Sequence, residues 1–473
     1  MAPSSPKAQL KNTDAREPEC GADSGSHPHH ASLGSRQLGL TALVAVMYLT
    51  VSGGAYGLED AVGAAGPRLA LLLCLLVPLS LSLPTALMAA ELTALMPVEG
   101  GFYFWVKEAF GPFAGFAEAY LTILYTAVDM AIYPVMFSAY LSFLFPLTLT
   151  ARILLGIAMV WISGLLNVLG IRPVGNTSMV LAIVVLLPFS ALVTFGLPRL
   201  IHWQIPPAPV GGGDFWAALS GGLLVVIWNF SGWENLSVVA REIKDARRNY
   251  LRAISIVLPL VVLGYVLPLA VSVSGAADTA KWTTGWFSET GRRLGGSHLG
   301  EALALGGMVS SFAIFEAAML WVSRLPFVLA RECFLPQPLA DLWERSDAPW
   351  KAILVCCIVF TLLIPLGFTE LIVLDVFFYM TALALEMGAL VRLRRLRPAR
   401  DGLFTIGGGK WTLYLTALAP LLTWMATIGL ALAQSSGHVD FLIAISLALT
   451  VWPAYRLCRR RWGGPSAVTD EAV

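Results

Sequence analysis

Charged residues are scarce in this sequence. Only 13% of its 473 residues are charged, whereas soluble globular proteins carry about 25%. Hydrophobic residues make up 57% of the chain. A soluble protein of this length could not cover its surface with so few charges, so the composition predicts an integral membrane protein. The net charge of +1 gives no basis for binding nucleic acid.

Motifs for cofactors and catalysis are also missing. The sequence has no phosphate-binding loop, no zinc-protease motif, no nucleophile elbow, and no Cys/His set with metal-ligand spacing. We therefore expect no cofactor, no metal and no enzymatic activity. The histidines all fall in predicted tails or loops: His27, His29, His30, His202, His298 and His438.

Long apolar runs are abundant instead. A helix needs about 20 apolar residues to cross the hydrocarbon core of a bilayer. Runs of this length predict an all-α protein with about twelve transmembrane helices. The predicted spans are 37–64, 68–96, 113–143, 149–169, 174–197, 215–240, 252–274, 300–330, 351–368, 371–391, 411–433 and 438–457.

The distribution of basic residues predicts the orientation of these spans. If the N-terminus is cytoplasmic, 25 of the 31 lysines and arginines lie on the cytoplasmic side and 6 lie outside. Cytoplasmic loops are enriched in these residues, so we expect a multi-pass plasma (inner) membrane protein with both termini cytoplasmic. The polar segment 1–36 is predicted to be a disordered cytoplasmic tail, and 458–473 a second cytoplasmic tail.

Two predicted spans are interrupted near their middles. The first contains Ser-Gly-Gly at 52–54, and the sixth contains Asn229, Ser231 and Gly232. Broken helices at corresponding positions are typical of transporters built from inverted repeats, which bind substrate at the breaks. We therefore predict a core of five plus five helices at 37–394, followed by two further transmembrane helices at 411–457.

Acidic residues occur within the predicted spans, and almost no lysine or arginine lies at the same depth. Buried ionisable groups in membranes are costly and usually functional, so a proton, a cation or a cationic substrate is the expected partner. Glu59, Asp60, Glu91, Glu118 and Glu386 lie near helix ends, where structural roles are expected. The candidates for ion coupling are Asp129, Glu234, Glu316 and Asp375.

Several stretches resemble a known family. They are VSGGAYGLEDAVGAAGP (51–67), MAAELTALMPVEGGFYFWV (88–106), VDMAIYPVMFSAYL (128–141), WNFSGWENLSVVAREI (228–243) and YMTALALEMGALVRLR (379–394). With these stretches the chain resembles the amino acid–polyamine–organocation (APC) superfamily, and within it the polyamine uptake branch. The resemblance implies a LeuT-type fold with substrate at the two helix breaks.

The resemblance also implies particular substrate-binding residues. These are Ser52, Gly53, Gly54, Asp129, Tyr133, Asn229, Phe230, Gly232, Trp233 and Glu316.

The coupling ion is not determined by the resemblance. The fifth predicted span, 174–197, contains no lysine whose ammonium group could replace a sodium ion, so protons and sodium stay as alternative coupling ions.

The function predicted from these features is secondary active transport by alternating access. The favoured version is proton-coupled uptake of a cationic amine, either an amino acid or a polyamine. A neutral amino acid carrier or exchanger is the first alternative, and a transporter-like membrane sensor is an alternative from another class. The expected partners are the small-molecule substrate, a proton or sodium ion, and the lipid bilayer.

Overall fold

The structure is a computed structural model that describes residues 38–98, 100–170, 176–201, 215–238, 243–274, 276, 278–397, 403–432 and 438–462. The predicted tail at 1–36 and residues 463–473 of the second predicted tail lie outside these ranges. Within them, extended pairing is limited to two isolated bridges, Leu38 with Ile243 and Trp343 with Ala348. The predicted all-helical architecture is confirmed.

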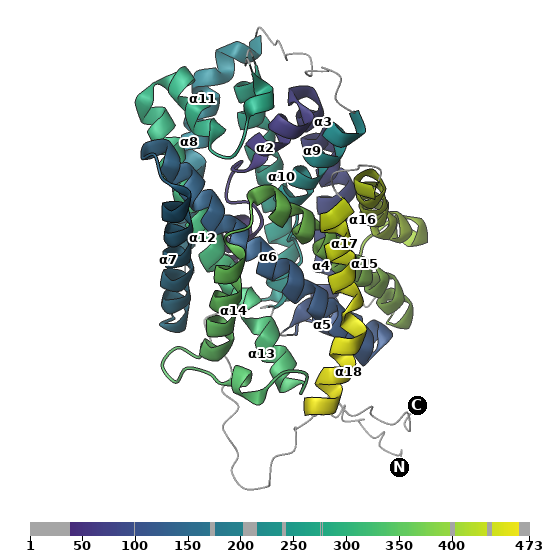
Figure 1. Ribbon diagram of the computed structural model, residues 1–473. Helices are drawn as coiled ribbons and strands as arrows, with labels where there is room; N and C mark the ends of the chain where they lie inside the picture. The colour runs from purple at the N-terminus through teal and green to yellow at the C-terminus, as the bar shows by residue number, and fades with distance from the viewer. Residues whose placement is uncertain are drawn as a thin grey trace, which may run out of the picture.

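The described residues are helical over most of their length (Figure 1). In chain order the helices are α1 (Leu40–Val51), α2 (Leu58–Ala65), α3 (Pro67–Val77), α4 (Leu83–Leu95), α5 (Gly101–Phe110), α6 (Pro112–Leu144), α7 (Leu149–Val168), α8 (Asn176–Ile201), α9 (Phe215–Asn229), α10 (Ala246–Val273), α11 (Trp286–Gly295), α12 (Ser297–Val322), α13 (Arg324–Arg331), α14 (Trp350–Leu363), α15 (Phe368–Leu396), α16 (Gly409–Leu432), α17 (His438–Leu449) and α18 (Val451–Trp462).

The twelve predicted spans correspond to the apolar helices of the described chain. Nine helical stretches there are long and apolar enough to cross a membrane, and three shorter apolar helices, α1, α9 and α14, accompany them. α1 and α9 are short because the chain leaves the helix at the two predicted breaks. The span predicted at 37–64 is therefore the pair α1 and α2, and the span at 215–240 is α9 with the 3₁₀ turn η2 (Asn235–Val238).

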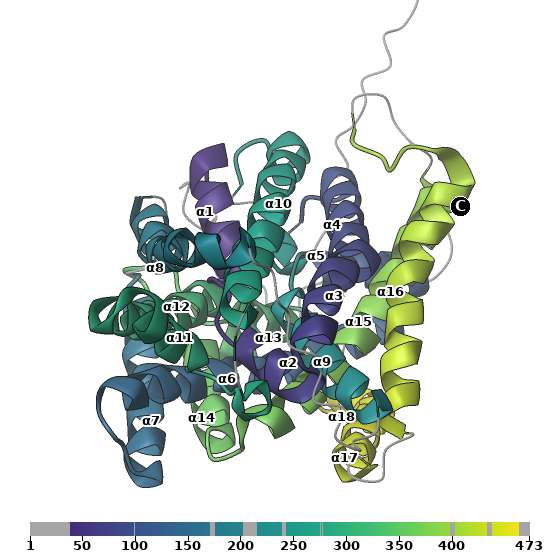
Figure 2. The same cartoon turned by 90° about the horizontal axis from the view of Figure 1, so that it is seen from above.

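Large apolar side chains cover the outer helices. They are exposed because the surrounding medium of such a chain is hydrocarbon, which does not penalise apolar surface as water does. Examples on α7, α8 and α16 are Leu154, Leu165, Val180, Leu187, Leu415 and Leu422. α7 and α16 lie on opposite sides of the molecule in both views (Figures 1 and 2).

The centre of the molecule is α6, which packs against α5, α7, α12, α14 and α15. α2 packs against α9, so the two discontinuous helices are neighbours. α11 lies at one end of the molecule, and α13 and α18 lie at the opposite end (Figure 1). This arrangement surrounds both helix breaks with other helices.

Three helical features differ from the predicted spans. α11 was not expected, because it is a short amphipathic helix with Glu289, Arg292 and Arg293 and has no long apolar run. The span predicted at 300–330 is divided at Ser323 into α12 and α13. The last span changes from α17 to α18 at Thr450, whose hydroxyl bonds to Leu447 O.

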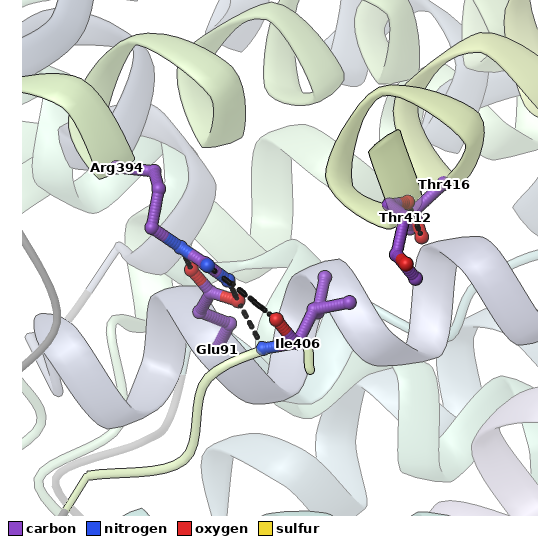
Figure 3. A network of polar contacts seen from close by, with 5 residues as sticks. All are labelled: Glu91, Arg394, Ile406, Thr412 and Thr416. Carbon is purple, nitrogen blue, oxygen red and sulfur yellow. Dashed lines mark hydrogen bonds and ion pairs between the residues drawn. The ribbon is translucent and has the colours of Figure 1, made fainter. Parts of the chain in front are cut away.

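One ion pair explains an acid that was predicted to be structural. Arg394 of α15 makes a two-pronged salt bridge to Glu91 of α4. The backbone N–H of Ile406, in the connection between α15 and α16, also donates to Glu91 at 2.8 Å (Figure 3). Because a buried carboxylate is costly without partners, this network ties α4, α15 and the start of α16 together. At the start of α16, Thr416 donates to Thr412 O.

Candidate functional site

The first helix break spans residues 52–57, between α1 and α2. Gly53, Gly54 and Gly57 have φ values of 66°, 98° and 91°, a region that residues with a Cβ rarely adopt. The hydroxyl of Ser310, on α12, donates to the carbonyl oxygen of Gly53. Glycine therefore permits the break, and α12 satisfies one of the backbone groups that the break releases.

The second break follows α9, and two hydroxyl groups from α10 and one from the segment between α3 and α4 bind its carbonyl groups. Gly232 has a φ of 87°. The donor and acceptor pairs are Tyr265 to Asn229 O (3.1 Å), Ser82 to Phe230 O (2.8 Å) and Tyr250 to Trp233 O (2.9 Å). Non-helical backbone at membrane depth needs such partners, so this break is a fixed part of the fold.

A narrow cavity lies between the two breaks. Its walls come from α1 and the first break, from α6, from the end of α9, and from α10 and α12, so residues far apart in sequence meet there. The lining residues are Thr50, Val51, Ser52, Tyr56, Tyr133, Met136, Trp228, Asn229, Tyr265, Ser310 and Ile314.

Asp129 of α6 lies directly behind this wall. The hydroxyl of Tyr133 donates to both of its carboxylate oxygens, at 3.1 and 3.0 Å. The indole N–H of Trp228 donates to Oδ1 at 2.9 Å. Tyr133 and Trp228 both line the cavity, so the charge of Asp129 is held against the cavity wall by two aromatic donors.

A second acid, Asp375 of α15, lies within electrostatic range of Asp129 and Tyr133. Asp375 is 2% exposed, and its Oδ1 has no hydrogen-bond partner among the described residues. In the part of the chain that the structure describes, neither Asp129 nor Asp375 forms an ion pair with a basic side chain. Among the described residues, the site therefore combines two carboxyl groups with aromatic rings, and no salt bridge neutralises either acid.

Three of the predicted binding residues, Ser52, Tyr133 and Asn229, line the cavity. The other predicted residues of the two breaks lie close to these lining residues in the sequence. Phe230 and Trp233 are buried, and Trp233 donates its indole N–H to Phe230 O.

Glu316 lies elsewhere, although it is on the same helix as two lining residues. Its Oε1 accepts a hydrogen bond of 2.7 Å from Asn167 of α7. Ile314 and Ser310 of α12 face the cavity, whereas a residue two positions after Ile314 points about 200° away on a helix. The contact of Glu316 is thus one between α7 and α12.

Several aromatic lining residues were not predicted. Trp228 immediately precedes Asn229, and Tyr56 lies within the first break, so their positions beside predicted residues were a usable signal. Tyr265 lies in the middle of α10 and carried no such signal. Its ring packs edge-on against Phe230 at 4.9 Å between centroids.

The two acids that open α2 organise the opposite end of the site. Glu59 accepts hydrogen bonds from Gly57 N (2.7 Å) and Tyr140 OH (2.9 Å), and from Gly285 N (3.2 Å) at the start of α11. Asp60 accepts one from Thr284 at 2.7 Å. These contacts connect α2 to α6 and to the start of α11.

In the ranges that the structure covers, no group of three or more His, Cys, Asp and Glu side chains is arranged to hold a metal ion. The site itself offers carboxyl groups, hydroxyl groups, the N–H and carbonyl groups of the helix breaks, and aromatic faces.

Two discontinuous helices around a narrow cavity in a multi-span helical protein are the arrangement typical of membrane transporters. The family model described as amino acid permease matches residues 38–452. The chain therefore belongs to the amino acid permease family of the APC superfamily, as its resemblance predicted. This membership places the protein in a family of transporters.

Curated relatives align over most of the chain. The polyamine transporter PUT1 of Oryza sativa subsp. japonica is 30% identical, over 97% of this chain and 87% of that protein. The polyamine transporter RMV1 of Arabidopsis thaliana is 29% identical, over 89% of this chain and 85% of that protein. The Asc-type amino acid transporter 1 of Mus musculus is 29% identical, over 66% of this chain and 61% of that protein.

Proposed function

We propose that the protein is a secondary active transporter that carries a cationic amine, an amino acid or a polyamine, into the cell by alternating access. The substrate binds between the two helix breaks, and one group of helices moves against the other so that the site opens to each side in turn. The proton gradient across the plasma membrane drives the uptake.

One observation carries the choice of a cationic amine. Asp129 bonds to two residues that line the cavity, Asp375 lies within electrostatic range of Asp129, and no basic side chain of the described residues pairs with either acid. Two ionised carboxylates in a buried site repel each other and lose hydration. A bound ammonium group offsets both costs, and the faces of Tyr133 and Trp228 add cation–π attraction.

The names of the relatives support the same substrate class. The two plant proteins are named polyamine transporters, and the mouse protein is named an amino acid transporter. The helix breaks also present free N–H groups and carbonyl groups, which suit the carboxylate and the amine of an amino acid. Amines with and without a carboxylate are therefore both candidates.

A ligand panel tests the substrate class. Purified protein is heated with putrescine, spermidine, arginine or leucine, and the unfolding temperature is measured for each. A ligand present at 100 times its dissociation constant stabilises the folded state by about 2.7 kcal/mol, so cationic amines should raise the unfolding temperature. Stabilisation by leucine alone would identify a neutral amino acid carrier or exchanger instead, and stabilisation by none would contradict the proposal.

The orientation of the chain is tested by cysteine labelling. In a background without native cysteines, Lys281→Cys lies in the turn before α11, and Glu344→Cys lies between α13 and α14; both parent side chains are exposed. With both termini cytoplasmic, a membrane-impermeant maleimide added to intact cells should label position 281 and not 344. After the membrane is permeabilised both should react, and the reverse pattern in intact cells would refute the orientation.

A further inference from the structure

The last helix of the described chain, α18, has two faces of different character. Its inner face is formed by residues that are partly buried against the protein, and its outer face by exposed residues. The inner face comprises Val451, Ala454, Tyr455, Cys458 and Trp462, and the outer face comprises Trp452, Pro453, Arg456, Leu457, Arg459, Arg460 and Arg461. Because residues three and four positions apart share one side of a helix, the four arginines lie on the side that the protein does not cover.

The inner face holds α18 against two other parts of the molecule. The ring of Tyr455 packs edge-on against Phe113, with centroids 5.2 Å apart. It also contacts Phe116 at 5.4 Å and Phe334 at 5.8 Å. Phe113 and Phe116 lie in the first two turns of α6, and Phe334 follows α13. The orientation of α18 is therefore fixed by an aromatic cluster, which keeps the arginines directed away from the protein.

The charges of the outer face are not neutralised by the protein. In the part of the chain that the structure describes, no acidic side chain forms a salt bridge with any of the four arginines. Their contacts are with rings: the guanidinium of Arg456 lies 4.6 Å from the ring centroid of Trp452, and that of Arg461 lies 5.4 Å from Trp462. A ring contact uses the face of a guanidinium, so the N–H groups at its edge stay available to an oxygen acceptor.

The outer face also lies at the right depth for a lipid headgroup. The stretch Phe441–Trp462 is 22 residues long and apolar enough to cross a membrane, and its arginines stand at the end, where the hydrocarbon meets the headgroups. Tryptophan is typical of this level, and Trp452 and Leu457 are 47% and 60% exposed. An anionic phospholipid offers phosphate oxygens to the arginines and acyl chains to these apolar side chains.

We infer that the outer face of α18 binds anionic phospholipids of the adjoining leaflet. Arg456, Arg459 and Arg460 contact the phosphate groups, and Leu457 and Trp452 contact the start of the acyl chains. The inference goes beyond transport and does not depend on which substrate the protein carries.

Lipid on this face would support a contact at the same end of the molecule (Figure 1). Phe334, which packs on Tyr455, is two residues after Glu332. Glu332 pairs with Lys107 of α5 and accepts a hydrogen bond from Tyr103 at 3.2 Å. Anionic lipid that holds α18 in place therefore also stabilises the packing around this ion pair, and it should raise the stability of the folded protein.

The test measures the unfolding temperature in mixed micelles in which phosphatidylglycerol progressively replaces phosphatidylcholine. A lipid that binds the folded state raises this temperature, so the parent should become more stable as phosphatidylglycerol increases. Each basic residue near an anionic surface adds about fivefold in affinity. Arg459→Gln/Arg460→Gln should therefore need about 25-fold more phosphatidylglycerol for the same rise. Arg459→Lys/Arg460→Lys keeps the charge and should resemble the parent.

The matched control is Arg292→Gln/Arg293→Gln. These two arginines are also adjacent in sequence, but both pair with Glu289 of the same helix, α11, at the opposite end of the molecule. Their replacement should leave the response to phosphatidylglycerol unchanged.

Two results would overturn the inference. One is a response of Arg459→Gln/Arg460→Gln equal to that of the parent. The other is an equal stabilisation of the parent by free inorganic phosphate, which would indicate a site for soluble anions. If the glutamine variant is too unstable for the melting experiment, native mass spectrometry of freshly purified protein counts its bound phosphatidylglycerol molecules. The variant should hold fewer than the parent, and an equal count would also refute the inference.

Discussion

Asp129→Asn is expected to weaken binding of a cationic amine by about 2–5 kcal/mol, the cost of removing one partner from a buried charge pair. This corresponds to a loss of affinity of about 30-fold to 5,000-fold. The amide has no charge to offer an ammonium group. It can accept hydrogen bonds on one oxygen only, whereas the carboxylate now receives them from Tyr133 and Trp228. Binding of neutral amino acids, measured on the same protein by calorimetry, should change little.

The matched control is Asp278→Asn. Asp278 has the same chemical group, but it is 70% exposed and pairs with Lys281 at 3.2 Å in the turn before α11. Its replacement should leave the affinity for amine unchanged. If Asp129→Asn also binds cationic amines like the parent, Asp129 only orients Tyr133 and Trp228, and the choice of a cationic substrate loses its main support.

The number and position of the spans were predictable because the thickness of a bilayer fixes the length of an apolar helix. The two breaks were also predictable. Gly53, Gly54 and Gly232 stand in the middle of apolar runs, and each of them adopts a positive φ. α11 escaped prediction because a ten-residue amphipathic helix has no long apolar run.

The walls of the cavity could be predicted only in part. Ser52 and Asn229 were found because they belong to the breaks, and Tyr133 because it belongs to the span-three motif of the superfamily. Tyr265 lies within an ordinary apolar span. Only the packing of α10 turns its hydroxyl to Asn229 O.

The acids near helix ends show a second limit of sequence reasoning. Glu91 and Glu118 occupy similar positions in their spans, and both were expected to be structural. Glu91 has Arg394 as a partner, whereas Glu118 has an oxygen without one. The difference depends on which helix lies opposite. The register of α6 against α15 cannot be read from either segment alone.

Gly53→Ala is expected to abolish amine uptake while the protein still folds. A Cβ at position 53 would lie 2.3 Å from Cδ1 of Ile314 and 2.6 Å from Oγ of Ser310. Both residues line the cavity, and Ser310 donates to the carbonyl oxygen of Gly53. The methyl group must therefore push Ile314 toward the cavity or break the hydrogen bond that holds the first break.

A control variant separates the two costs of this substitution, which are the strain of a positive φ and the crowding around the new methyl group. Placing a side chain at a positive φ costs about 1–2 kcal/mol by itself. Gly409 has a φ of 79°, similar to the 66° of Gly53, but no atom lies within 4 Å of its Cβ position. Gly409→Ala therefore carries the backbone cost without the crowding, and its uptake in proteoliposomes should be close to that of the parent. Equal uptake by the two variants would mean that the first break does not shape the binding site. Loss of uptake in Gly53→Ala alone, with a parent-like elution profile in size-exclusion chromatography, would show that space at residue 53 is needed for transport.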